Sequence, residues 1–247
     1  MALIHSFEQS GNSLFRRRGQ IPAVLFLIVL PVLYFTDYSV LSDPTSFIFT
    51  ILAILVSLLG FVVRAISIGT TPKGTSGRNT KEQVAESLNR TGIYSTLRHP
   101  LYLGNYLMWI GIVIFTFNIY FVIIVSLAFW LYYERIMFAE ERFLERKFGE
   151  DYLEWSKTVP AFIPSFNRYI KGQIPFSLIS VLRREYSGVL ATVFSFAFVD
   201  HLRYYFLTGE FDPFRLSSYI LLITIFITLI LRTLKHSTRL LNEEGRS

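Results

Sequence analysis

The stretch LYLGNYLMWIGIVIFTFNIYFVIIVSLAFWLYY, residues 101–133, decides the fold because it runs for about 33 residues without a charged side chain. As one helix rising about 1.5 Å per residue, it would be far longer than a hydrocarbon core about 30 Å thick, so the chain must fold back within it. Asn118, between Phe117 and Ile119 near the midpoint, is the natural turn residue. The stretch therefore predicts a helical hairpin of two membrane spans of about 16 residues each.

The composition places the rest of the chain in a membrane as well. Hydrophobic residues make up 52% of the 247 positions and charged residues only 17%, which is too apolar for an ordinary soluble domain. The absence of cysteine excludes a disulfide framework, a thiolate metal site and a cysteine nucleophile. The net charge of +6 is unevenly distributed, and we expect no nucleic-acid partner from it.

Further apolar runs predict further spans. The run that follows Arg16, Arg17 and Arg18 begins like a signal peptide, but no small-residue cleavage site follows it, so we interpret it as an uncleaved span. The last two runs are separated by the polar turn 208–213 and form a second hairpin. The apolar runs outside 101–133 are 21–35, 46–63, 186–199 and 216–231. Together with the central hairpin, they predict an all-α integral membrane protein with about six transmembrane helices, two helical hairpins and cytoplasmic amphipathic helices.

The distribution of Lys and Arg predicts the orientation. About 22 of the 24 basic residues fall in segments that a six-span chain places on one side, and only Arg203 and Arg215 fall opposite. By the positive-inside rule that side is the cytoplasm, so both termini are expected there. A multi-pass protein of a bacterial inner membrane and one of the endoplasmic reticulum fit equally well.

The chain divides into three parts. Residues 1–45 contain the first span, residues 46–165 form a core that carries the polar motifs, and residues 166–247 contain the C-terminal hairpin and a basic tail. The segment Phe166–Pro175 is the expected joint before the last hairpin. The last hairpin could enlarge a lipid-facing groove, or it could serve packing or oligomerisation. The oligomeric state stays open.

Two polar segments border the central hairpin. The motif from Arg98 to Gly104 stands where a charged loop enters the apolar run, and the charged segment 134–147 leaves that run with helical periodicity and stops at Gly149. On the residues alone, the first could be an interfacial anchor and the second a solvated helix face with ion pairs. The four histidines are scattered without ligand spacing, so we expect no metal site.

Several motifs in order carry a resemblance to a known family: Gly92-Ile93-Tyr94, Arg98 to Gly104, Glu140-Glu141, Phe148 to Tyr152, Val159-Pro160 and Ile163-Pro164. Over about residues 50–165, the chain resembles the isoprenylcysteine carboxyl methyltransferase family, which is related to the phospholipid N-methyltransferases. The resemblance implies an integral membrane enzyme that uses S-adenosyl-L-methionine without a soluble Rossmann-type domain. It places the cofactor at the cytoplasmic face.

The resemblance also implies a set of cofactor-binding residues: Leu88, Tyr94, His99, Pro100, Leu101, Tyr102 and Glu140, with the segment 86–89 and Asn79 adding to the pocket. Glu140 would hold the amine or ribose of the cofactor, and aromatic faces would favour its cationic sulfur. We add Arg98 as a partner for the methionine carboxylate, with the amides that start the Pro100 helix as the alternative. Arg98 and Glu141 are thus the catalytic candidates, and Glu141 or His99 would serve as a base for an amine acceptor.

One position departs from the family pattern. Carboxyl methyltransferases of the family have a substrate-engaging arginine four residues before the cofactor glutamate, where this chain has Ile136, and the adjacent Arg135 is turned about 100° around a helix. Arg135 is the substrate-binding candidate. The expected function is methylation of a lipid-like or prenylated membrane substrate at a carboxylate, phosphate or amine. The alternatives are an NADPH-dependent membrane sterol-type reductase and a non-catalytic membrane scaffold.

Overall fold

The structure is a computed structural model that describes residues 2–20, 22–38, 42–72, 74–75 and 85–246. This part of the chain is helical and contains no strand. Its elements, in chain order, are α1 (Leu3–Arg17), α2 (Pro22–Phe35), α3 (Asp43–Gly69), the short 3₁₀ helix η1 (Gly92–Ser95), α4 (Pro100–Ile114), α5 (Ile119–Phe148), α6 (Glu150–Thr158), α7 (Leu178–Thr208) and α8 (Leu216–Ser237).

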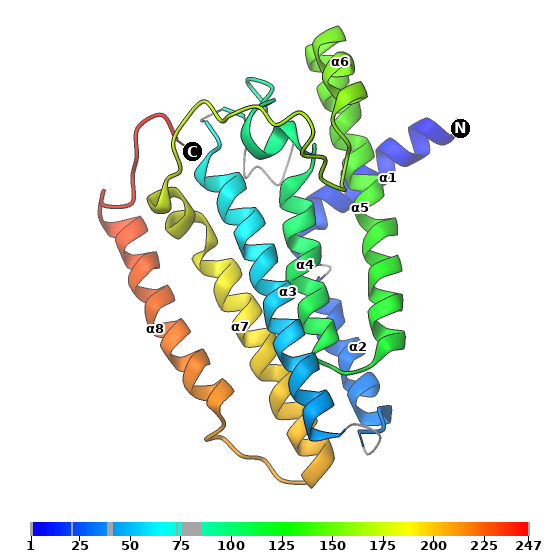
Figure 1. Ribbon diagram of the computed structural model, residues 1–247, viewed down its shortest axis with the longest axis vertical. Coiled ribbons are helices and arrows are strands. Elements are labelled where there is room, and N and C mark those ends of the chain that lie inside the picture. The colour runs from blue at the N-terminus through cyan, green and yellow to red at the C-terminus, as the bar shows by residue number, and fades with distance from the viewer. Residues whose placement is uncertain (1, 21, 39–41, 73, 76–84, 247) are drawn as a thin grey trace.

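Six of these helices form a bundle of roughly aligned rods: α2, α3, α4, α5, α7 and α8 (Figure 1). The connections α4–α5 and α7–α8 lie at one end of the bundle, and α6 lies with both chain termini at the other end (Figure 1). The expected all-α architecture and its two hairpins are confirmed. The end that carries α6 gathers every segment in which the motifs occur.

The bundle has the dimensions and the surface of a membrane domain. Within the described ranges, α3, α5 and α8 are long and apolar enough to cross a membrane, and α2 and α4 are shorter apolar helices. Large apolar side chains such as Leu55, Ile124 and Phe226 are more than half exposed on its outside, as lipid contact requires. Helix α7 extends beyond the predicted run 186–199 at both ends, because the polar groups there are bonded within the bundle.

Local sequence explains the central hairpin. The Asn118 side chain accepts a hydrogen bond from the Phe121 amide at 3.0 Å and so caps α5, and Phe117 turns the chain with a φ of 60°. Pro100 stands at the start of α4, where its missing N–H costs nothing. Helix α5 continues from the apolar run through the charged segment to Phe148, and Gly149 ends it with a φ of 55°.

Small residues bring α3 and α4 into close contact. A Cβ atom on Gly104 would lie 2.4 Å from Arg64 Cγ and 3.0 Å from the Gly60 carbonyl oxygen, so only glycine fits there. Ser57 donates a hydrogen bond to the Met108 carbonyl at 2.8 Å along the same seam. The approach sets the Arg64 side chain beside the first turns of α4.

Helix α1 was not anticipated from the sequence. It packs on the charged half of α5, with Phe15 buried and with Gly11 so close that a Cβ atom there would be 2.1 Å from the Arg135 carbonyl oxygen. The sequence signal is a segment that is apolar on one side and polar on the other. It was overlooked because the segment is too polar to be a span.

Candidate functional site

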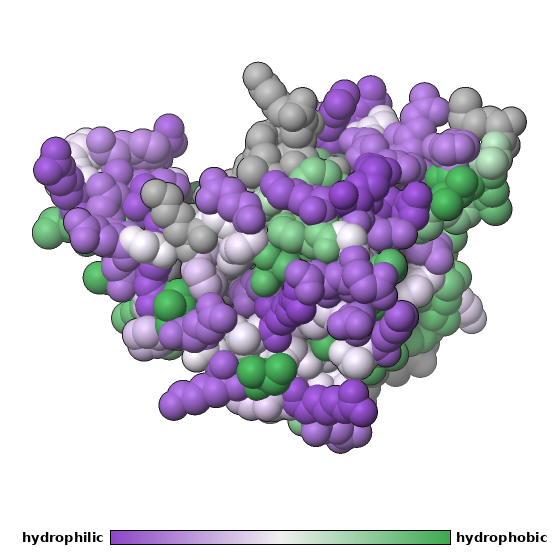
Figure 2. All heavy atoms as spheres, turned by 90° about the horizontal axis from the view of Figure 1, so that it is seen from above, coloured by the Kyte–Doolittle hydropathy of each residue, from purple (hydrophilic) through white to green (hydrophobic). Residues whose placement is uncertain are grey.

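A cavity of about 370 Å³ opens at the end of the bundle that carries α6. Figure 2 looks down on this end and shows hydrophilic residues over most of it, with apolar groups between them. The volume lies in the range of small-molecule sites. The lining comes from α1, α3, α4, α5, α7 and the 70–99 connection, and its members are Phe15, Arg18, Arg64, Ile68, Thr75, Ala85, Tyr94, Arg98, His99, Pro100, Leu101, Tyr102, Asn105, Tyr133, Glu140, Phe143, Leu144, Arg184 and Glu185.

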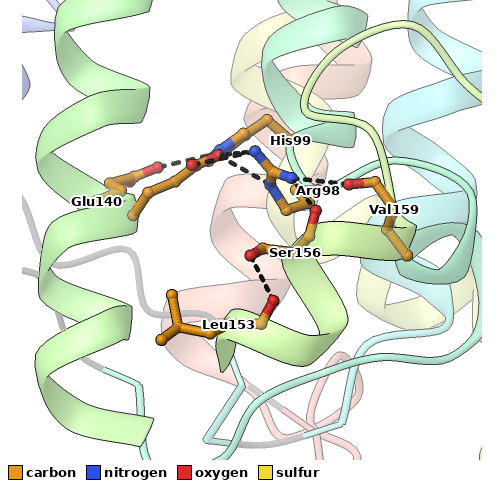
Figure 3. A network of polar contacts seen from close by, with 7 residues as sticks. Arg98, His99, Glu140, Leu153, Ser156 and Val159 are labelled. Carbon is orange, nitrogen blue, oxygen red and sulfur yellow. Dashed lines mark hydrogen bonds and ion pairs between the residues drawn. The ribbon is translucent and has the colours of Figure 1, made fainter. Parts of the chain in front are cut away.

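His99 lies between two carboxylates that follow one another on α5. Its Nε2 is 2.9 Å from Glu141 Oε1, and its Nδ1 is 3.6 Å from Glu140 Oε2. Tyr102, one turn into α4, donates a hydrogen bond to Glu140 Oε1 at 2.8 Å. His99 is only 7% exposed, so these contacts fix the ring (Figure 3). Glu140 keeps a side that faces the cavity.

Arg98 joins α5 to the end of α6. Its Nε and Nη2 donate to the Glu141 carboxylate at 2.9 and 3.1 Å, and its Nη1 donates to the carbonyls of Ser156 and Val159 at 2.8 Å each (Figure 3). A planar guanidinium with a forked carboxylate partner is held rigidly. Although Arg98 lines the cavity, most of its donors are engaged by the protein.

The Val159-Pro160 motif acts through its backbone. The Arg98 amide donates to the Pro160 carbonyl at 2.9 Å, and the His99 amide donates to the Ala161 carbonyl at 3.1 Å. Because Pro160 has no amide, the segment can offer its carbonyls without a competing donor at that residue. The motif thus fixes the two residues that enter the site from the start of α4.

Aromatic rings form much of the remaining wall. The Tyr102 ring lies 5.7 Å from the His99 ring in a stacked arrangement and 4.8 Å from the Tyr133 ring. Burial raises the pKa of Tyr94 to about 12, so its hydroxyl stays protonated at neutral pH. Neutral, electron-rich ring faces near a carboxylate suit a cationic ligand.

A chain of polar contacts continues from these rings to α7. Asn105 Nδ2 is 3.4 Å from the Tyr133 hydroxyl, and Arg64 donates to Asn105 Oδ1 at 2.5 Å. Arg64 also donates twice to the Glu185 carboxylate, at 2.6 and 2.7 Å. The site is therefore connected from α6 through α5, α4 and α3 to α7.

The structure brings together most of the residues expected at the cofactor site, because Tyr94, His99, Pro100, Leu101, Tyr102 and Glu140 line one cavity together with Arg98. Leu88 is not in the lining but packs against the adjoining apolar cluster that includes Tyr152 and Trp155. Glu141 is behind the wall, paired with Arg98 and His99. Asn79 falls outside the described residues.

Arg135 does not reach the cavity. Its guanidinium carbon lies 3.3 Å from the centre of the Phe7 ring, on the side of α5 that packs against α1. Ile136, in contrast, is completely buried. Sequence reasoning did not single out Arg64, Arg184 and Glu185, which also line the cavity. Their position beside long apolar runs was the available signal.

Comparison with known proteins shows which family the central segment of the chain resembles. Residues 48–151 match the sequence model of the phospholipid methyltransferase family. The matched segment contains most of α3, all of η1, α4 and α5, and the start of α6, and thus nearly all motif residues of the cavity. The resemblance to membrane methyltransferases is confirmed for this segment.

Individual relatives agree. The chain is 31% identical over 116 residues to the protein-S-isoprenylcysteine O-methyltransferase of Saccharomyces cerevisiae. The aligned residues make up 47% of this chain and 48% of the yeast protein. It is 30% identical over 125 residues to the Xenopus laevis protein of the same name, covering 50% of this chain and 42% of that one. The chain thus spans about half the length of the curated relatives it matches.

A third relative has a different name. The nickel-cobalt-cadmium resistance protein NccN of Alcaligenes xylosoxydans xylosoxydans is 35% identical over 94 residues, which are 38% of this chain and 41% of that protein. Among the residues that the structure describes, no group of three or more His, Asp or Glu side chains is arranged to hold a metal ion. No solved structure matches the chain.

Proposed function

We propose that this protein is an integral membrane methyltransferase that uses S-adenosyl-L-methionine and acts on a lipid-like or prenylated substrate. One observation carries the proposal: Tyr94, His99, Tyr102 and Glu140 converge on one cavity at the polar end of an apolar bundle. The matched family segment contributes all four of them. The substrate class rests on the names of the relatives and on the membrane setting of the cavity.

The side chains that line the cavity fit the cofactor. A carboxylate that faces the cavity, Glu140, suits an ammonium group or ribose hydroxyls, and the rings of Tyr94 and Tyr102 suit a sulfonium. The apolar side chains of Leu101 and Phe143 suit a purine ring. When bound, S-adenosyl-L-methionine supplies a methyl group on a positively charged sulfur.

The residues of the chain contribute position and proton control. Methyl transfer needs an acceptor atom aligned with the methyl–sulfur bond, so rigid walls are the main requirement. Arg98 provides rigidity by tying Glu141 to the carbonyls of Ser156 and Val159. A carboxylate or phosphate acceptor needs no base, whereas for an amine acceptor His99 Nδ1 would take up the proton while its Nε2–H donates to Glu141 Oε1.

Binding of S-adenosylhomocysteine tests the cofactor. In isothermal titration calorimetry on the full chain in lipid nanodiscs, the wild type should bind S-adenosylhomocysteine and not NADP. Glu140→Gln should weaken that binding, and Glu134→Gln is the matched control, because Glu134 is an exposed residue of the same helix. Binding of NADP instead would support the reductase, and binding of neither nucleotide would support the scaffold.

The acceptor can be found directly. The protein is incubated with methyl-labelled S-adenosyl-L-methionine and a total membrane lipid extract, and mass spectrometry identifies the labelled species. We expect label in a lipid or prenylated thiol with the wild type, and much less with Glu140→Gln. Label in no lipid fraction would contradict the proposed substrate class.

We also propose that the α6 end faces the cytoplasm, in line with the positive-inside rule. Because the chain has no cysteine, single cysteines can be introduced without background. A membrane-impermeant maleimide added to intact cells should label Glu210→Cys, in the α7–α8 connection. It should label Glu154→Cys of α6 only after the cells are permeabilised. The reverse pattern would place the site on the outer side.

A further inference from the structure

Helix α1 lies where the bundle meets the membrane surface. Figure 1 shows it running across the direction of the bundle helices at the α6 end. Its last residue, Arg17, stands five residues before Pro22, with which the apolar helix α2 begins. Leu27 of α2 is exposed on the outside of the bundle, as lipid contact requires. The C-terminal turn of α1 is therefore at the depth of the lipid headgroups.

The inner face of α1 packs on α5 and reaches the cavity. Gly11 is so close to α5 that a Cβ atom there would overlap the Arg135 carbonyl oxygen. One turn further along, Phe15 is buried, and the Arg18 guanidinium carbon lies 3.7 Å from the centre of its ring. Phe15 and Arg18 both line the cavity. A movement of α1 would thus displace two members of the cavity wall.

The outer face of α1 is polar and ends in two cations. Gln9, Ser13, Arg16 and Arg17 are exposed and border a shallow hollow on this face. Within the described part of the chain, neither the Arg16 nor the Arg17 guanidinium has a carboxylate partner. The protein itself therefore leaves two positive charges of this helix unmatched at the membrane boundary.

The environment of these charges indicates what binds them. Arg146 of α5 is satisfied within the protein, because it forms an ion pair with Glu8 of α1 at 2.6 Å. Arg16 and Arg17 lie on the opposite face, on a helix that continues into a membrane span. A basic, amphipathic helix in this position is complementary to anionic headgroups, and each cation near such a surface strengthens the attraction about fivefold.

We propose that Arg16 and Arg17 bind the headgroups of anionic phospholipids, and that this contact holds α1, with Phe15 and Arg18, against the cavity. The charge of the membrane surface thereby influences how tightly the cavity binds its ligand. The lipid contact is independent of the proposed function, whereas its effect on cofactor affinity rests on that function.

Hydrogen–deuterium exchange on the full chain tests the lipid contact. The protein is placed in nanodiscs of phosphatidylcholine, alone or mixed with phosphatidylglycerol. Phosphatidylglycerol should slow amide exchange over Leu3–Arg17 about fivefold or more, and high salt should remove the effect by screening the charges. Free glycerol phosphate added to the phosphatidylcholine nanodiscs should not reproduce the effect, because the contact requires a charged surface.

Matched variants show which charges respond. Arg16→Gln combined with Arg17→Gln should abolish the response, and Arg16→Lys combined with Arg17→Lys should retain it, because the charges are kept. The control combines Lys147→Gln with Lys157→Gln, which removes two exposed cations from the end of α5 and from α6. Helix α6 extends beyond the bundle (Figure 1), so this control should respond to phosphatidylglycerol like the wild type.

Calorimetry with S-adenosylhomocysteine in the same nanodiscs tests the link to the cavity. In the wild type, phosphatidylglycerol should raise the affinity severalfold. The combined glutamine variant of Arg16 and Arg17 should have the same affinity in both lipids, equal to that of the wild type in phosphatidylcholine. Circular dichroism checks that the variants are folded, which is expected because both arginines are exposed.

The lipid contact is overturned if α1 exchanges equally fast in both lipids, or if the glutamine variant of Arg16 and Arg17 responds like the wild type. Loss of the response in the control variant would also overturn it, because overall charge would then be the cause. Slower exchange of α1 without a change in S-adenosylhomocysteine affinity would refute the link to the cavity. If the wild type binds no S-adenosylhomocysteine in either lipid, the proposed function fails, while the exchange experiment still tests the lipid contact.

Discussion

The two ends of the bundle both contain partly buried charged side chains, but they use them differently. At the end with the helix connections, the Asp200 carboxylate accepts hydrogen bonds from Arg215 at 2.8 and 2.9 Å and from Ser217 at 2.7 Å. Arg203 packs on the rings of Phe115 and Phe117 and donates to the Phe115 carbonyl at 3.0 Å. None of these side chains lines the 370 Å³ cavity.

At the α6 end, similar ion pairs surround a cavity. Glu141 is held by Arg98 and His99, and Glu185 is held by Arg64, while Glu140 faces the open space. The comparison shows that partly buried ion pairs occur at both ends, whereas the 370 Å³ cavity lies at the α6 end. What distinguishes the α6 end is a cavity, and the charged side chains of its wall are held in place by hydrogen bonds to other protein groups.

The largest effect is expected from Arg98. Arg98→Gln leaves Glu141 without its forked partner and frees the carbonyls of Ser156 and Val159, so the free energy of unfolding should fall by about 3 kcal/mol. Arg215→Gln, at the opposite end, should cost about 1 to 2 kcal/mol, because its partner Asp200 keeps the Ser217 hydrogen bond.

Chemical unfolding in detergent micelles measures both values, and limited proteolysis shows where each variant opens. Arg98→Gln should expose α6 and the 156–165 segment, whereas Arg215→Gln should expose the α7–α8 connection. Equal proteolysis of α6 in both variants would show that Arg98 does not anchor it.

Glu140 and Asp200 give the next contrast. Glu140→Gln should weaken S-adenosylhomocysteine about tenfold to a hundredfold, because a charge-assisted contact contributes about 1.5 to 3 kcal/mol. Asp200→Asn should leave that affinity unchanged and lower the unfolding temperature instead. Calorimetry and thermal unfolding on the same preparations separate the two effects. A loss of affinity in Asp200→Asn would mean that the two ends are coupled.

Two glycines with positive φ extend the comparison with smaller effects. Gly209 ends α7 in the left-handed conformation, with φ 75° and ψ 1°, which asparagine also tolerates. Gly149 ends α5 with φ 55° and ψ −128°, which side chains rarely adopt. Gly209→Asn should be nearly neutral, whereas Gly149→Asn should cost about 1 to 3 kcal/mol in unfolding free energy.

The same two variants differ in their distance from the site. Because Gly149 sets the angle at which α6 leaves α5, Gly149→Asn should also lower methyl transfer, while Gly209→Asn should not. Unfolding curves and the labelled-methyl assay provide the two measurements. Similar stabilities for the two variants would show that the Gly149 conformation is not a constraint.

The smallest effect concerns Tyr94 and pH. Burial raises its pKa from the ordinary 10 to about 12, so the folded state keeps a proton that the unfolded chain loses. Stability from this residue is therefore constant below pH 10 and falls as the pH rises from about 10 to 12. Tyr94→Phe should lose less stability than the wild type in that window, measured by unfolding at stepped pH. Parallel curves would show that Tyr94 is not buried in the folded state.

Much of this architecture could be predicted from local patterns. The uncharged run 101–133 with Asn118 at its midpoint predicted the hairpin, and Gly149 predicted the end of α5, because turns and caps depend on a few adjacent residues. The motif residues Tyr94, His99, Tyr102 and Glu140 were predicted to share one site, and they line one cavity. Their roles toward a ligand stay predictions.

Other parts of the site could not be predicted from spacing. The sequence predicted ligand contacts for both Arg98 and Arg135, but the fold pairs Arg98 with Glu141 and stacks Arg135 on Phe7 of α1. Helix α1 itself escaped notice, because its sequence has too little apolar length for a span and its partner α5 lies more than a hundred residues away.

The sequence by itself determined the membrane setting, the two hairpins and the concentration of motifs at one end, since these follow from apolar run lengths, turn residues and charge distribution. Only the tertiary structure decided which charges meet: Arg64 with Glu185, Arg98 with Glu141, and Arg184 in the same cavity wall as Glu140. The physical reason is that these pairs join helices distant in sequence, and their contacts depend on close packing such as that of Gly60 with Gly104.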